Sequence, residues 1–230
     1  MATVPEALQA VLARVEAAAR AVGRDPAAVC LVAVSKTFAP PALRAAWAAG
    51  QRAFGENYVQ EALDKMQSLQ DLPIEWHFIG PIQSNKTRFI AERFDWVHSV
   101  DRLKIARRLS EARPAGLPPL QVCLQVNLEG EDSKSGAPAQ EVEALARAAA
   151  GLPGLALRGL MTIPRPTPDP VQQRAQFRAL RVLQDRLGAA GIALDTLSMG
   201  MSEDLEAAIA EGATMVRVGR AIFGERTRPG

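Results

Sequence analysis

Lys36 is the side chain whose surroundings most suggest chemistry. It stands in Val34-Ser-Lys-Thr37, directly after the apolar run Val29-Cys-Leu-Val-Ala-Val34, which has the length and β-branched content of a strand buried on both faces. Alternation along that strand would place Lys36 on the same face as Val34. Burial would lower the pKa of the amine and make it a nucleophile. The alternative is an ordinary surface lysine just beyond the strand. Only five of the 27 basic residues are lysines, and of the other four we expect two in solvent (Lys65 and Lys104) and two near the same rim (Lys86 and Lys134).

Two glycine turns near the C-terminus could bind a phosphate. One is Leu197-Ser-Met-Gly-Met-Ser202 and the other is Val216-Arg-Val-Gly-Arg220. A strand that leaves through glycine into a helix exposes backbone N–H groups to an anion, although a lone glycine is often only a turn residue. Glu203 and Asp204 directly follow the first turn and would repel a phosphate unless they point away. We therefore expect the closest contacts at Gly219 and Arg220, supported by Ser198 and the Gly200 backbone.

Other kinds of site find little support. No Walker-type or dinucleotide-type glycine pattern is present, and the two histidines, His77 and His98, lie in different predicted strands without cysteines nearby. We expect no metal site. Asn57, at the end of Phe54-Gly-Glu-Asn57, could line the mouth of a site or cap the next helix. Cys30 and Cys123 lie in apolar, strand-like segments and are predicted to be buried free thiols.

Composition and charge restrict the class of protein. The 230 residues carry a formal net charge of +2 with acidic and basic residues interspersed, which gives no reason to expect nucleic-acid binding. No apolar run approaches the ~20 residues that cross a bilayer. Charged residues at regular intervals near the N-terminus break any signal-peptide core. We expect a soluble, cytoplasmic protein without membrane contacts.

The elements that must position these residues alternate along the chain. An N-terminal helix is indicated by a capping-box spacing of Thr3 and Glu6 around Pro5. Hydrophobic patterning and turn residues then predict strands near 29–35, 52–55, 75–79, 95–99, 120–127, 155–161, 194–198 and 214–218, with helices near 40–49, 57–69, 83–92, 101–112, 138–149, 170–189 and 202–211. Eight strands in strict alternation with helices favour a closed parallel α/β barrel that occupies 1–230 as a single domain. A doubly wound open sheet is the main competitor. In such a barrel the site lies at the carboxyl ends of the strands, where Lys36 and both glycine turns fall.

These motifs together resemble the pyridoxal phosphate homeostasis protein family. The resemblance covers almost the whole chain, in the family's order, and rests on Val34-Ser-Lys-Thr37, Phe54-Gly-Glu-Asn-Tyr58, Trp76-His-Phe-Ile-Gly-Pro-Ile-Gln83 with Asn85-Lys86, Ser133-Lys-Ser-Gly136, Gly159-Leu-Met-Thr162, Leu197-Ser-Met-Gly-Met-Ser202 and Val216-Arg-Val-Gly219. It implies a (β/α)8 TIM barrel like the N-terminal domain of alanine racemase, standing alone with an extra N-terminal helix. It also implies a protein that binds pyridoxal phosphate and takes part in vitamin B6 and amino-acid homeostasis, with no established enzymatic activity.

The resemblance also assigns roles to individual residues. Lys36 would form the Schiff base with the cofactor, and Arg217 would face the pyridine nitrogen. The phosphate would be held by Ser198, Gly200, Gly219 and Arg220, and the pocket would be lined by Asn57 and Met161. Arg220 stands where relatives often carry a small polar residue, a change that does no harm if the backbone N–H makes the contact.

A carrier and an enzyme are distinguished by the group beside the pyridine nitrogen. An arginine keeps that nitrogen unprotonated and makes the ring a weaker electron sink than an aspartate would. Racemisation also needs an acid–base group on each face of the substrate, and Tyr58, the only tyrosine, is expected at the start of a helix rather than over the ring. We therefore expect a non-catalytic monomer that binds the cofactor and serves apo-enzymes. The alternatives are a low-activity racemase or decarboxylase, and a barrel aldolase whose Lys36 attacks a sugar phosphate.

Overall fold

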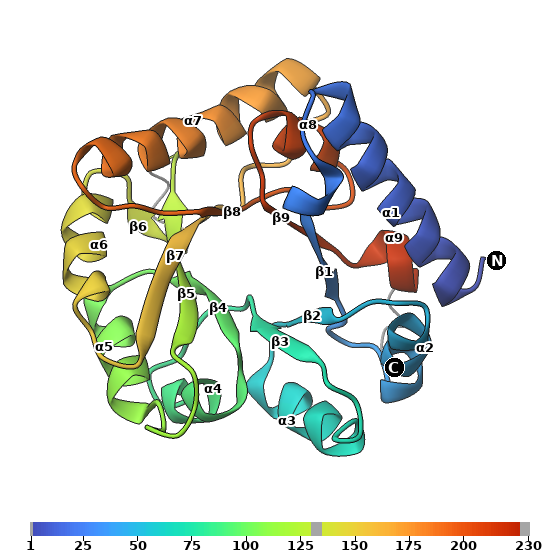
Figure 1. Cartoon of the computed structure of the whole chain (residues 1–230), viewed down its shortest axis with the longest axis horizontal. Coiled ribbons are helices and arrows are strands. Elements are labelled where there is room, and N and C mark those ends of the chain that lie inside the picture. The colour runs from blue at the N-terminus through green and yellow to red at the C-terminus, as the bar shows by residue number, and fades with distance from the viewer. Residues whose placement is uncertain (1, 130–134, 226–230) are drawn as a thin grey trace.

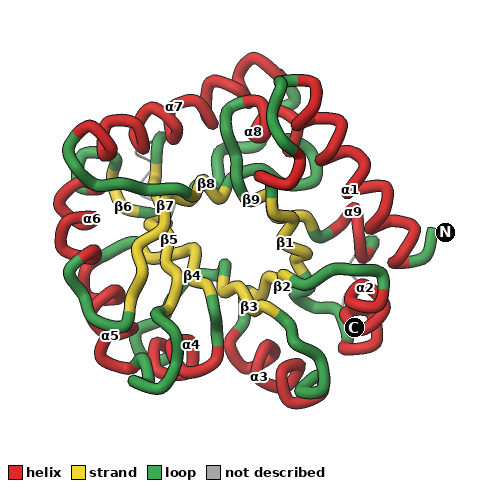
Figure 2. The backbone as a smooth tube through the Cα atoms, in the orientation of Figure 1, coloured by secondary structure: helices red, strands yellow, loops and turns green. Residues whose placement is uncertain are grey.

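Eight parallel strands close into a barrel in the computed structural model, which describes residues 2–129 and 135–225 (Figures 1 and 2). The order around the barrel is β4-β3-β2-β1-β9-β8-β7-β5, and pairing between β4 and β5 completes the ring. That pairing confirms the barrel and rules out the open sheet. The described strands are β1 Cys30–Val34, β2 Ala53–Glu56, β3 Glu75–Phe78, β4 Trp96–Val100, β5 Leu120–Asn127, β6 Ala137–Pro138, β7 Leu155–Met161, β8 Thr196–Ser198 and β9 Met215–Val218.

Helices surround the barrel, as Figure 2 shows. Two short elements were not expected from the sequence. One is β6, which extends the sheet beside the end of β5, and the other is α9, a single turn after β9. The described helices are α1 Val4–Ala21, α2 Pro40–Ala48, α3 Val59–Ser68, α4 Thr87–Arg93, α5 Leu103–Ala112, α6 Val142–Ala150, α7 Pro170–Ala189, α8 Leu205–Ala210 and α9 Arg220–Phe223, together with a 3-10 turn over Pro26–Ala28.

The strands are apolar on both faces because each face is covered. Along β1, Val32 points into the barrel interior, where it packs with Cys123 and Met161, while Leu31 and Ala33 join the larger core between sheet and helices. The side chains in the barrel interior and those between sheet and helices are almost fully buried. Burial on both faces explains why the run 29–34 is continuously hydrophobic rather than alternating.

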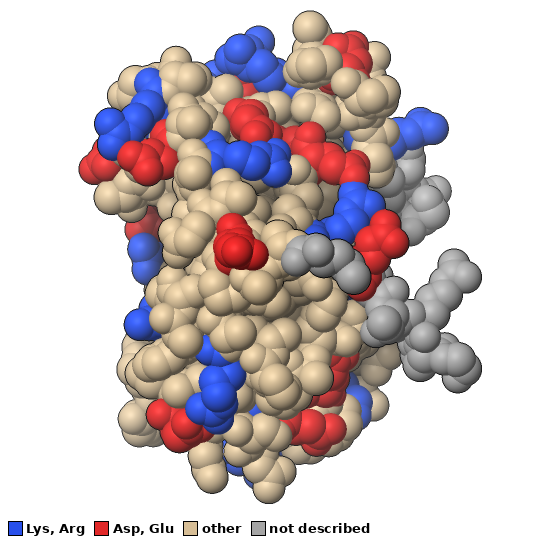
Figure 3. Space-filling model, turned by 90° about the vertical axis from the view of Figure 1, so that its right-hand side faces the viewer, with Lys and Arg blue, Asp and Glu red and all other residues tan. Residues whose placement is uncertain are grey.

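The N-terminal helix α1 lies outside the barrel against α8 and α9 (Figure 1). The predicted capping box is present, because the Thr3 hydroxyl accepts from the Glu6 N–H and the Glu6 carboxylate accepts from the Thr3 N–H. Leu8, Val11 and Val15 recur at helical spacing and are buried. On the side of the molecule that is shown in Figure 3, acidic and basic side chains are interspersed. Within the described ranges, no helix combines the length and apolar character needed to span a bilayer.

Candidate functional site

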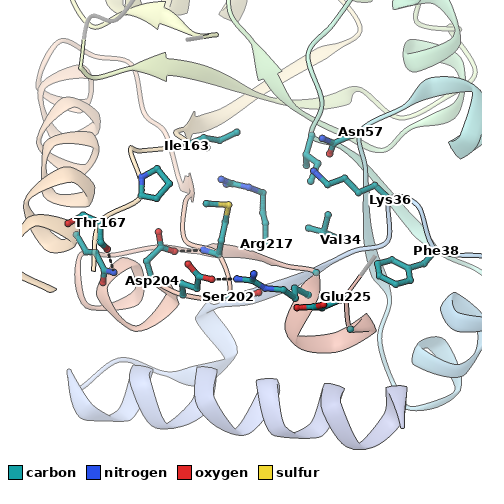
Figure 4. A pocket seen from close by; sticks show the side chains of 18 residues that line it. Val34, Lys36, Phe38, Asn57, Ile163, Thr167, Ser202, Asp204, Arg217 and Glu225 are labelled. Atoms are coloured by element: carbon teal, nitrogen blue, oxygen red, sulfur yellow. Dashed lines mark hydrogen bonds and ion pairs between the residues drawn. The ribbon is translucent and has the colours of Figure 1, made fainter. Parts of the chain in front are cut away.

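A cavity of about 530 Å³ opens at the carboxyl ends of the strands. Lys36, just beyond β1, and Arg217, on β9, belong to neighbouring strands and both reach into it (Figure 4). The apolar side chains of Phe38, Ile163 and Pro166 contribute to its walls. Charged and polar side chains thus converge on a cavity with partly apolar walls, an arrangement that suits a small polar ligand.

The backbone just before Lys36 is held by the side chain of Lys65, on α3. Lys65 Nζ donates to the Ser35 carbonyl at 2.8 Å and pairs with the Glu56 carboxylate at 2.7 Å. We expected Lys65 in solvent, and this was wrong: its side chain is only 5% exposed. A lysine buried at this depth needs hydrogen-bonding partners, and here carboxylates from the end of β2 and from α3 provide them.

Glu61 connects the same cluster to Thr37. Its Oε1 lies 2.5 Å from Lys65 Nζ and accepts from the Thr37 N–H at 2.5 Å. Thr37 has φ = 71°, a left-handed conformation that a β-branched residue rarely adopts. The hydrogen bond from its amide helps to hold this backbone, so the residue after Lys36 is fixed in an unfavourable conformation. The bond network therefore restrains the chain both before and after the half-buried Lys36.

Arg217 forms part of the cavity floor. Its side chain is buried, with Nη1 donating to Ser198 Oγ at 2.6 Å and Nη2 donating to the Thr162 carbonyl at 2.9 Å. Burial lowers the pKa of Arg217 to about 10, while Asp204 opposes the shift. The guanidinium therefore remains a cation at neutral pH and presents donors only.

Asn57 occupies the wall at the end of β2. Its Oδ1 is buried and has no hydrogen-bond partner within the described part of the chain. Gly80 fixes the backbone at this point, because a Cβ at Gly80 would lie 2.2 Å from the Asn57 carbonyl oxygen. An unpartnered buried amide oxygen beside a cavity is a group that a ligand donor could satisfy.

The turn after β8 begins at Gly200, whose φ of 95° favours glycine. Met201 and Ser202, the next two residues, line the cavity. Glu203 and Asp204, the two acidic residues after this turn, both line the cavity as well. The Asp204 carboxylate accepts from the Met201 N–H at 2.6 Å, and burial raises the pKa of its carboxyl. Arg14 on α1 donates to the Ser202 carbonyl at 3.1 Å, so the N-terminal helix supports this turn from outside.

The turn after β9 presents the start of α9 to the same cavity. Gly219 and Arg220 line it, and the first amides of a helix have no acceptor within the helix. The Arg220 guanidinium pairs with Glu203, and both side chains are largely exposed. This ion pair couples the two glycine turns and offsets one of the acidic charges beside them.

The residues predicted from the sequence fall into two groups. Five of the eight line the cavity: Lys36, Asn57, Arg217, Gly219 and Arg220. Met161, Ser198 and Gly200 do not line it but lie buried beneath it or behind its lining. The Ser198 hydroxyl contacts Arg217 and His98.

The remaining candidate side chains lie elsewhere. Tyr58 is 56% exposed at the start of α3 and does not line the cavity. Lys104 is exposed, as expected, and Lys86 lies beside the Phe89 ring rather than in the cavity wall. Lys134 lies outside the described residues. Both cysteines are free thiols, as expected; Cys123 is buried, whereas Cys30 is only partly buried. Burial raises the pKa of Cys30 to about 11 and that of Cys123 to about 12.

Sequence reasoning missed Lys65 and Glu61, which act on the Lys36 segment without lining the cavity. The available signal was their i, i+4 spacing on α3 after the glutamate that ends β2. Among residues 2–129 and 135–225, no group of three or more His, Cys, Asp or Glu side chains is arranged to hold a metal ion.

Comparison with known proteins places this chain in a family. Residues 7–227 match the model of the alanine racemase N-terminal domain. The pyridoxal phosphate homeostasis protein of Pseudomonas aeruginosa is 63% identical over 98% of this chain and 97% of its own length. The Escherichia coli K12 protein of the same name is 53% identical, covering 93% and 92% of the two chains. PipY of Synechococcus elongatus, solved with pyridoxal phosphate bound, is 40% identical with a TM-score of 0.82, covering 93% of this chain and all of that one.

Proposed function

This chain belongs to the family of pyridoxal phosphate homeostasis proteins, and on that premise we propose that its cavity binds pyridoxal phosphate. The protein carries or buffers the cofactor and helps to maintain intracellular vitamin B6 and amino-acid homeostasis. The observation that supports this most is the convergence, in one cavity, of the Lys36 amine, the Arg217 guanidinium and two glycine turns.

The residues present fit the chemical groups of the cofactor. Pyridoxal phosphate supplies an aldehyde, which condenses with an amine to a Schiff base with loss of one water. Lys36 provides that amine. The turns at Gly200 and at Gly219 and Arg220 provide backbone donors for the phosphate, and the unpartnered Asn57 Oδ1 in the cavity wall can accept from a ligand donor. Met161 and Ser198 support the site from beneath it.

Arg217 favours binding over catalysis. As a donor-only cation at neutral pH, it cannot take a proton and keeps a facing pyridine nitrogen as an acceptor, which weakens the ring as an electron sink. Tyr58, the only tyrosine in the chain, stands away from the cavity and so provides no acid–base group on its second face. Both features support a protein without robust catalytic activity.

We place the protein in the cytoplasm, in keeping with its two free cysteines. The whole chain acts as one cofactor-binding domain. It works as a monomer that exchanges cofactor with apo-enzymes that need it.

Reduction of the complex tests the covalent link. The purified protein should gain a Schiff-base absorption band with pyridoxal phosphate, and borohydride followed by peptide mapping should find the label on Lys36. Lys36→Ala should lose the band while retaining weaker binding through the phosphate turns. Lys104→Ala, which removes an exposed lysine on α5, should behave as wild type. Label on another lysine, or no band in the wild type, would refute the assignment.

Isotope exchange tests the absence of catalysis. Amino acids such as alanine, incubated with the loaded protein in heavy water, should keep their α-hydrogen. Exchange that is abolished by Lys36→Ala would instead show a low-activity racemase-type enzyme.

A further inference from the structure

A line of hydrogen bonds crosses the barrel interior from an exposed carboxylate to Arg217. Glu75 Oε1, at the start of β3, lies 2.7 Å from His77 Nε2, and His77 Nδ1 lies 2.8 Å from His98 Nε2 on β4. His98 Nδ1 then lies 2.7 Å from Ser198 Oγ on β8, which accepts from Arg217. Figure 1 shows β3 and β4 on the opposite side of the barrel from β8 and β9.

The two ends of the line differ in their access to solvent. The Glu75 side chain is 47% exposed, at the amino ends of the strands, whereas both imidazoles and the serine are fully buried. Arg217 lines the cavity at the carboxyl ends. The bonds therefore connect the two ends of the barrel through its interior.

The chemistry of the groups sets a direction for every bond. A carboxylate only accepts, so a His77 ring with one proton carries it on Nε2, and its Nδ1 accepts from His98. His98 Nε2 then holds the proton, and its Nδ1 accepts from the Ser198 hydroxyl. The Ser198 oxygen is left with lone pairs for Arg217. Every donor points toward Glu75.

Local electrostatics agree with this protonation pattern. The hydrogen bond from His77 lowers the pKa of Glu75 and keeps it ionised. Burial, with His77 and Arg217 nearby, holds the pKa of His98 well below its ordinary value, so that ring is neutral at pH 7. The Trp96 ring stacks on His77 at 5.7 Å and restrains its plane.

We propose that Glu75, His77 and His98 are positioning residues that orient the Ser198 hydroxyl and so fix the Arg217 guanidinium at the floor of the cofactor cavity. An acceptor at the far end of the barrel thus decides which way a hydroxyl beneath the cofactor site points. The proposal rests on the proposed function only for its effect on pyridoxal phosphate binding. The direction of the line of hydrogen bonds is a property of the protein alone.

Imidazole nitrogen NMR tests the direction without any cofactor. The protein has two histidines, so four ring nitrogens report on the direction of the hydrogen bonds. In the wild type at pH 7 both rings should show a protonated Nε2 and an unprotonated Nδ1. Any other protonation pattern in either ring would overturn the proposal.

A donor placed at the exposed end should reverse the direction of every hydrogen bond between residue 75 and Ser198. Glu75→Lys offers only donors to His77 Nε2, so the proton of each ring should move to Nδ1, including that of His98, which makes no contact with residue 75. The matched control is Glu143→Lys, the same exchange at another side chain of 47% exposure. Glu75→Gln, an isostere that can donate or accept, should give a mixture of both forms and serves if Glu75→Lys does not fold. A change confined to His77 would overturn the coupling.

Cofactor binding tests whether the orientation of Ser198 and Arg217 affects the cavity. Glu75→Lys should weaken pyridoxal phosphate binding roughly five-fold relative to Glu143→Lys, in line with the loss of about one hydrogen bond's contribution. Reversed tautomers with unchanged affinity would overturn the positioning role. Failure of the wild type to bind the cofactor would overturn the proposed function. The tautomer measurements would still decide the direction of the line of hydrogen bonds.

Discussion

Lys65→Met should destabilise the protein strongly, although Lys65 does not line the cavity. The substitution keeps most of the apolar stem and removes the ammonium that faces Glu56 and Glu61 and donates to the Ser35 carbonyl. Glu56 is fully buried and would then keep the hydrogen bond from the Ser35 hydroxyl, 2.6 Å away, but lose its cationic partner. Breaking a buried ion pair from one side typically costs about 3–5 kcal/mol. That is a large part of the 5–15 kcal/mol, roughly, by which a folded protein is stable.

The loss of folding stability caused by Lys65→Met should depend on pH and be smaller at low pH. Burial already raises the pKa of Glu56 above its ordinary 4.5, and Lys65 is the main group that opposes this shift. Without Lys65 the folded-state pKa rises further, and a carboxyl with a raised folded pKa favours the folded state when protonated. Its stabilisation is therefore present at low pH and is lost as pH rises through the folded pKa. The deficit of Lys65→Met should narrow between pH 8 and pH 5, by at most about 1.4 kcal/mol per pH unit.

Urea denaturation at several pH values measures both effects. Lys104→Met, which changes an exposed lysine, is the control and should lie within about 0.5 kcal/mol of wild type. Adding Glu56→Gln to Lys65→Met removes the stranded charge and should recover at least about 1–2 kcal/mol. If Lys65→Met costs less than about 1 kcal/mol, or if its deficit is the same at pH 5 and pH 8, the buried ion pair is not what stabilises this region.

Three further predictions follow from the site. Gly80→Ala should cost about 2–3 kcal/mol in urea denaturation, because its Cβ would meet the Asn57 carbonyl at 2.2 Å; a wild-type midpoint would refute that packing. Arg217→Lys keeps the charge but cannot reach two acceptors as a fork, so pyridoxal phosphate titration should show roughly ten-fold weaker binding, and equal affinity would contradict the role given to the guanidinium. Cys123 is fully buried with its pKa raised to about 12, so it should not react with a thiol reagent at pH 8 in the native protein and should react fully in urea; fast native reaction of Cys123 would show that the barrel interior opens.

The barrel was accessible from the sequence because its strands carry a strong signal. The run 29–34 is apolar throughout, and such a run bounded by helices indicates a parallel strand covered on both faces. The two short elements, Ala137–Pro138 and Arg220–Phe223, were missed for the opposite reason. Two to four residues cannot establish a hydrophobic period, and their structure depends on neighbours that are distant in the chain.

The polar interior could not be predicted in the same way. Lys65 sits in a helix of mixed polarity, which normally indicates a solvated lysine, and only the end of β2 turns that position into a buried one. His77 and Ser198 are 121 positions apart in the chain and look unrelated; they meet His98 because the barrel closes. The rule that sites lie at strand ends therefore located Lys36, Gly219 and Arg220, and the family resemblance added Arg217. The groups that hold these residues required the three-dimensional arrangement.

The burial of both histidines has a consequence for how the molecule responds to acidity. Imidazole is the side chain that ordinarily titrates near neutrality, and here both copies are sealed inside the barrel. The outer surface thus carries no imidazole, and no surface histidine gains or loses charge between pH 6 and pH 8. A change in cofactor uptake over that interval would therefore report on groups other than a surface histidine.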